Sequence, residues 1–76
     1  MTPKTFYTTM SRDEVERVCR DARTTFLNFR QIALAGGSVG KLLAERLARA
    51  SGGLMTEMEI LYPERYEDRS SDGQAA

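Results

Sequence analysis

Two pairs of adjacent glycines divide this chain of 76 residues into short segments. Gly36-Gly37 and Gly52-Gly53 each follow a stretch with helical periodicity, and glycine readily adopts the left-handed conformation that ends many helices. Closely spaced stops of this kind leave room only for short helices joined by loops of a few residues. We therefore predict an all-α fold, a compact bundle of four to five helices.

The first two helices are predicted from their starts. Thr2 is a capping residue directly before Pro3, which suits the first helical position, so we expect a short helix from Pro3 to Thr9. Ser11 and Glu14 have the spacing of a capping box, in which each side chain bonds the other residue's backbone N–H. The second helix then has an apolar stripe with helical spacing, which consists of Val15, Val18, Cys19 and Ala22.

Three further helices follow. Thr25 is the expected cap of the third, whose apolar side comprises Phe26, Phe29, Ile32 and Ala33. We expect Ser38 to open the fourth, with a buried stripe of Val39, Leu42, Leu43, Leu47 and Ala50 and a solvated side of Lys41, Glu45, Arg46 and Arg49. Thr56 and Glu59 form a second capping box, which predicts a last helix from Glu57 to Tyr62.

Charge and composition separate a folded part from a tail. Residues 1–62 carry nine basic and seven acidic side chains, 9 − 7 = +2, and residues 63–76 carry two and four, 2 − 4 = −2. We assign residues 1–63 to one domain and residues 64–76 to a polar acidic tail, disordered beyond about Tyr66. With no long apolar run and no secretory signal, we expect a cytoplasmic protein without membrane partners.

Composition also argues against an enzyme. The chain has no histidine, and its single cysteine, Cys19, lacks a partner for nucleophilic chemistry. The stretch Ala35–Lys41 resembles a phosphate loop, but Ala35 and Leu42 occupy positions that need a glycine and a hydroxyl residue. We predict neither catalytic residues nor a metal or other cofactor.

The stretch from Cys19 to Ile32 has the spacing of a helix-turn-helix motif, with Arg23-Thr24 as its turn. Cys19 fills the small-residue position, and Thr24, Phe29 and Ile32 fall on core positions. On this numbering the residues that face DNA are Thr25, Phe26, Leu27, Asn28, Arg30 and Gln31, flanked by Arg23 and Lys41 as phosphate anchors. Arg30 suits guanine and Gln31 adenine, whereas Phe26 or Leu27 suits thymine methyl groups.

Ordinary structural roles compete with these assignments. Phe26 also fits a place in the core, and Arg30 and Gln31 also fit a plain solvated face. Lys41 and Arg46 are equally consistent with solvated helix residues. Leu54, Met55, Met58 and Tyr62 either form a dimer surface or close the small core.

Three segments resemble the Cro/YdaS-like family of short phage and bacterial helix-turn-helix regulators. They are "FRQIA" (29–33), "LLAERLARASGG" (42–53) and "MTEMEIL" (55–61). The resemblance covers roughly residues 3–63 and implies a Cro-like repressor that binds a double-stranded DNA operator, commonly as a homodimer. An alternative is that this scaffold serves instead as an inhibitor or adaptor that binds a host protein.

The chain departs from the family pattern at two places. Arg23 stands where the family usually has glycine, and a left-handed backbone costs a non-glycine residue about 1 kcal/mol, so we expect a rearranged turn. The stretch Leu34–Ser38 lacks the basic residues that the family carries after its third helix. Fewer phosphate contacts predict weaker binding with a shallower salt dependence.

Overall fold

The computed structural model describes residues 1–36 and 39–66, which contain helices and no strands. The all-α prediction is therefore confirmed for the described part of the chain. The elements are α1 (Pro3–Thr9), α2 (Arg12–Asp21), α3 (Phe26–Arg30), the π-helical segment η1 (Gln31–Ala35), α4 (Lys41–Ala50) and α5 (Glu57–Leu61).

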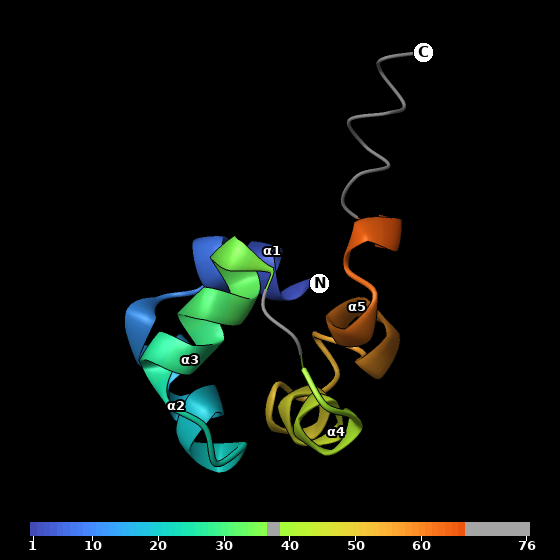
Figure 1. The fold of residues 1–76 in the computed structure, drawn as a ribbon. Coiled ribbons are helices and arrows are strands. Elements are labelled where there is room, and N and C mark those ends of the chain that lie inside the picture. The colour runs from blue at the N-terminus through green and yellow to red at the C-terminus, as the bar shows by residue number, and fades with distance from the viewer. Residues whose placement is uncertain (37–38, 67–76) are drawn as a thin grey trace.

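The helices form two groups around a shared core. Figure 1 shows α1, α2 and α3 with its continuation η1 on one side, and α4 with α5 on the other. The segment η1 packs against α1, while α4 packs against both α2 and α5. Phe6 and Phe29 meet edge to face inside the first group, with ring centroids 6.2 Å apart. The largest fully buried side chains are Phe6, Phe29, Leu47, Met55, Ile60, Val15, Val18 and Pro3.

The capping residues act largely as predicted. The hydroxyls of Thr2, Ser11, Thr25 and Thr56 each accept a hydrogen bond from a backbone N–H in the first turn of the helix that follows. The Thr56–Glu59 capping box is complete. The box at Ser11 is only half formed, because the Glu14 carboxylate accepts hydrogen bonds from Arg17.

The fourth helix differs from its prediction. It begins at Lys41 after Gly40, and the expected opening residue, Ser38, lies outside the described residues. Leu42, predicted to be buried, is 70% exposed, whereas Ala44 and Leu47 are fully buried. Residues two apart on a helix point about 200° apart, so seating Ala44 in the core turns Leu42 outward. The small Ala44 allows α4 to pack closely.

Of the four residues expected either to form a dimer surface or to close the core, one is buried and three are exposed. Met55 is fully buried and closes the core, whereas Leu54, Met58 and Tyr62 are each 42–44% exposed. The chain after α5 continues in one further turn, in which Arg65 N–H donates to the Tyr62 carbonyl and Tyr66 N–H to that of Pro63.

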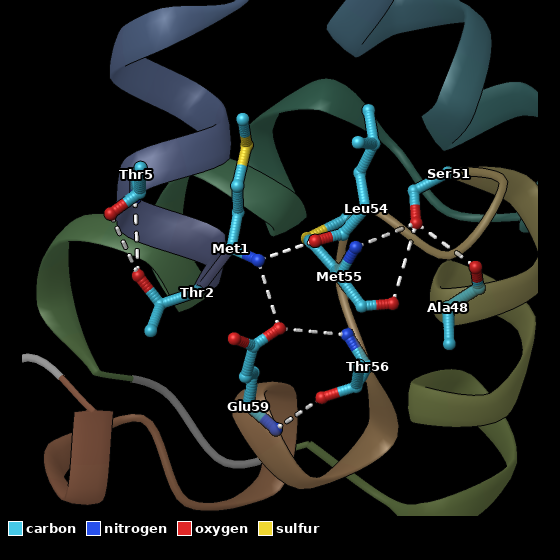
Figure 2. A network of polar contacts seen from close by, with 9 residues as sticks. All are labelled: Met1, Thr2, Thr5, Ala48, Ser51, Leu54, Met55, Thr56 and Glu59. Carbon is cyan, nitrogen blue, oxygen red and sulfur yellow. Dashed lines mark hydrogen bonds and ion pairs between the residues drawn. The ribbon is translucent and has the colours of Figure 1, made fainter.

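The amino-terminal end is fastened to the segment that leads into α5 (Figure 2). The Met1 ammonium group donates to the Leu54 carbonyl and forms an ion pair with Glu59 Oε1 at 2.9 Å. The same carboxylate oxygen accepts from the Thr56 N–H at 3.0 Å. The ammonium of Met1 holds the pKa of Glu59 below its ordinary value. One capping carboxylate thus links the two ends of the described fold.

Candidate nucleic-acid interface

The turn after α2 has a left-handed residue at its centre. Arg23 has φ 63°, and it is the one non-glycine residue with positive φ in the described ranges. Its N–H donates to the Arg20 carbonyl at 3.0 Å, and the Thr24 N–H donates to the Cys19 carbonyl at 2.9 Å. These two bonds define a Schellman motif. The prediction of a rearranged turn is therefore wrong, because Arg23 adopts the left-handed conformation that glycine would adopt at lower cost.

A distant side chain supports this turn. Arg46, on α4, donates from Nε to the Ala22 carbonyl at 2.8 Å. Carbonyl groups in the last turn of a helix lack helical partners, so this bond satisfies one of them. Arg46 is half-buried, which corrects the expectation of a solvated residue. The helical spacing of residues in the sequence could not predict this hydrogen bond, because its acceptor lies 24 residues away.

The inner side of α3 is anchored as predicted. Phe29 is fully buried, and Ile32 and Ala33 are 7% and 8% exposed. Cys19 lies beneath the turn at 2% exposure. Burial, with a smaller contribution from the charge of Glu16, raises the pKa of the Cys19 thiol to about 11. The thiol therefore stays protonated at neutral pH and serves as a packing group.

The outer side of α3 and η1 carries a mixed polar and apolar face, which we call the α3 face. It consists of Leu27, Arg30, Gln31 and Leu34, which recur at i, i+3, i+4 and i+7 and are all exposed. Leu27 is 70% exposed and Leu34 49%. The side chains of Arg30 and Gln31 are exposed and form no hydrogen bond or ion pair with another described residue. Each predicted base-reading residue of this face is therefore open to a ligand.

Three of the predicted DNA-contacting residues lie outside the α3 face. Phe26 is half-buried, with its ring centroid 5.7 Å from that of Tyr7 and 4.4 Å from the Arg12 guanidinium carbon. Asn28 is exposed, but its amide donates to the Thr24 hydroxyl at 2.9 Å. The Thr25 hydroxyl accepts a hydrogen bond from the Asn28 N–H. These side chains fix the start of α3 and are not in the α3 face.

Charges are distributed unevenly over the surface. On α2, Arg12 pairs with Glu16, and Arg17 pairs with both Glu14 and Asp21. The hydrogen bond from Arg17 lowers the pKa of Glu14, so that pair stays charged. No ion pair within the described ranges engages the cations at the end of α2, in the turn, or in α3 and α4, which are Arg20, Arg23, Arg30, Lys41, Arg46 and Arg49. These cations are therefore not held by acids of the described residues and can bind an anionic partner.

Other kinds of site receive no support from the described residues. No cluster of three or more Cys, Asp or Glu side chains among them is placed to hold a metal ion. No helix in residues 1–36 or 39–66 has both the length and the apolar character needed to cross a membrane. Comparisons with family models, curated proteins and solved structures find no match to this chain.

Proposed function

We propose that this protein is a sequence-specific DNA-binding transcriptional regulator that places the α3 face in the major groove. One observation carries the proposal. A short helix is anchored on one side by Phe29 and Ile32, follows a turn with a left-handed residue, and presents Arg30 and Gln31 exposed, with no hydrogen-bond partner among the described residues. A helix-turn-helix protein needs this division between an anchored and a free side.

The α3 face has suitable chemistry for reading base pairs. Arginine bonds guanine O6 and N7, and glutamine bonds adenine N6 and N7, each with two hydrogen bonds. Leu27 and Leu34 lie beside them and suit the methyl group of thymine. Arg23, in the turn before α3, and Lys41, at the start of α4, are exposed and supply charge for backbone phosphates.

The resemblance of the chain to Cro/YdaS-like regulators agrees with this assignment and extends it. It favours a cytoplasmic repressor of the phage or mobile-element type that binds an operator as a homodimer. The exposed Leu54, Met58 and Tyr62 are available for such a dimer. Two copies would also double the cations that one chain of neutral net charge supplies.

A second function is favoured by the exposed leucines. Leu27 and Leu34 in the α3 face, and Leu42 on α4, place three large apolar side chains in solvent. Exposed apolar groups of this kind also mark surfaces that bind proteins. In this alternative the same scaffold binds a host protein as an inhibitor or adaptor.

The two functions are separated by selection from a pool of random-sequence duplexes. We expect the full chain to enrich a pseudo-palindromic sequence and to shift it on a gel, with affinity that falls as salt rises. Arg30→Ala and Gln31→Ala should each lower discrimination at one base pair by about 1–3 kcal/mol. Arg49→Ala is the matched control: it also removes a charge, but any loss should be equal for all sequences.

Two results of this experiment would contradict the proposal. If no duplex is enriched by a folded protein, the DNA-binding proposal is overturned and the protein-binding alternative is favoured. If a duplex is enriched but Arg30→Ala and Gln31→Ala keep its full preference, the α3 face is not the reading surface.

A further inference from the structure

A second cationic feature lies apart from the α3 face, where the turn after α2 meets the carboxyl-terminal half of α4. It is a cleft of about 460 Å³ lined by Asp21, Arg23, Arg46, Arg49 and Ala50. We call it the arginine cleft. Three guanidinium groups from two elements that are distant in sequence thus share one concave surface.

The positive charge of the arginine cleft is largely uncompensated. Its one acid, Asp21, accepts a hydrogen bond from Arg17 at 3.0 Å, and Arg17 also pairs with Glu14, so the cleft itself sets one carboxylate against three guanidinium groups. Arg23 and Arg49 form no ion pair with any described residue. Arg46 uses Nε on the Ala22 carbonyl, which leaves the terminal nitrogens of its guanidinium as donors. A guanidinium has five N–H groups, so the cleft has many donors and few internal acceptors.

Helix ends alone do not explain this arrangement. The carboxyl-terminal ends of α2 and α4 both lie at the cleft, and each carries about half a negative charge. Two such ends and Asp21 together carry about two negative charges, and the cleft has three cations. Arg23 in addition holds a left-handed backbone that glycine would adopt without strain. Backbone strain of this kind persists most often where a side chain has a use.

We propose that the arginine cleft binds a phosphate group. Guanidinium groups pair with phosphate through two parallel hydrogen bonds, and Arg46 is already oriented by its bond to the turn. The cleft is also next to the turn that leads into α3. In a DNA complex it would therefore hold a backbone phosphodiester, a role that rests on the proposed function. The binding of a phosphate group itself does not depend on that function.

The test is a titration of the full-length, isotope-labelled protein with inorganic phosphate, followed by nuclear magnetic resonance. We expect saturable shifts of the arginine Nε–H signals of Arg23, Arg46 and Arg49, beyond those that sodium chloride causes at equal ionic strength. Arg49→Gln should weaken phosphate binding about tenfold, because one charge-assisted contact is lost. Arg20→Gln is the matched control, since Arg20 is also exposed and unpaired but does not line the cleft.

Two outcomes overturn the proposal: shifts that do not saturate or that chloride reproduces, and equal losses in Arg49→Gln and Arg20→Gln. A second titration with a short duplex of unrelated sequence identifies the source of the phosphate. If the duplex shifts the same three signals, the site takes a DNA phosphodiester. If only inorganic phosphate does so, the cleft is a site for free phosphate groups, and the proposed DNA function is decided by the duplex selection alone.

Discussion

The carboxyl-terminal ends of α2 and α4 are built alike but differ in the residue at their centre. At α4, Gly52 has φ 67°, its N–H donates to Arg49 and the Gly53 N–H donates to Ala48. At α2, Arg23 has φ 63° and the same pair of hydrogen bonds is present. One backbone geometry is thus formed once by glycine and once by arginine.

The surroundings do not explain this difference. A Cβ atom added to Gly52 would meet nothing within 4 Å, so only its φ favours glycine there. Each end also has its own support, from Ser51 at α4 and from Arg46 at α2. At the end of α4 a glycine adopts the left-handed conformation without strain. At the end of α2, just before α3, an arginine adopts it with backbone strain. We propose that the second end keeps arginine at this position for binding, whereas the first end only stops the helix.

The largest effect is expected from Ser51→Ala at the end of α4. The Ser51 hydroxyl donates to the Ala48 carbonyl at 2.9 Å and accepts from the buried Met55 N–H at 3.1 Å. Its removal leaves a buried donor unsatisfied and should lower the free energy of unfolding by about 2 kcal/mol. Urea denaturation measures this loss. Thr8→Ala is the control, because that hydroxyl also bonds a carbonyl but is exposed, and it should be nearly neutral.

A smaller loss is expected from Arg46→Met at the end of α2. Methionine keeps most of the apolar stem, but the Ala22 carbonyl loses its partner. Because this site is only half-buried, water replaces part of the bond, and we expect a loss of about 1 kcal/mol in urea denaturation. Arg49→Met, on the same helix without a partner, should change stability little. Equal stability of Arg46→Met and wild type would show that the turn needs no external support.

Arg23→Gly and Gly52→Ala, which replace the left-handed residue of each turn, should change the stability of the fold in opposite directions. Arg23→Gly relieves the left-handed strain and should stabilise the fold by about 0.5–1 kcal/mol after the greater freedom of unfolded glycine is subtracted. Gly52→Ala should destabilise it by a similar amount. Thermal unfolding of both variants measures the pair. Arg23→Ala removes the side chain but keeps the strain, so a gain in Arg23→Ala equal to that in Arg23→Gly would argue against strain as the cause.

The smallest expected effect is on the pH dependence of stability, through Glu59 on α5, the helix that follows α4. The hydrogen bond from the Met1 ammonium lowers the pKa of Glu59 from its ordinary value of 4.5. A carboxyl group with a lower pKa in the folded state stabilises the fold above its unfolded pKa. That stability should be lost as the pH falls from about 4.5 through the folded value. Glu59→Gln should flatten this part of the pH profile, whereas Glu57→Gln, on the same helix, should leave it unchanged.

Local signals explain what the sequence could predict. A capping hydroxyl and its target lie within one turn, so Thr2, Ser11, Thr25 and Thr56 could be assigned directly. The rotation of α4 was not predictable in this way, because three leucines compete for its inner face and packing against α2 and α5 selects Ala44 and Leu47. The bond from Arg46 to Ala22 and the contact of Met1 with Glu59 join residues far apart in sequence. Such partners follow from the assembled fold and not from any local pattern.

Arg23→Gly tests most directly whether the α2 end was shaped by binding. The measurement is its affinity for the duplex selected by the wild-type protein, taken together with its stability. We expect a protein that is more stable but binds the duplex about tenfold more weakly, with a salt dependence reduced by about one phosphate contact. A variant that is more stable and binds as tightly as wild type would contradict the account, because the strained arginine would then have no use.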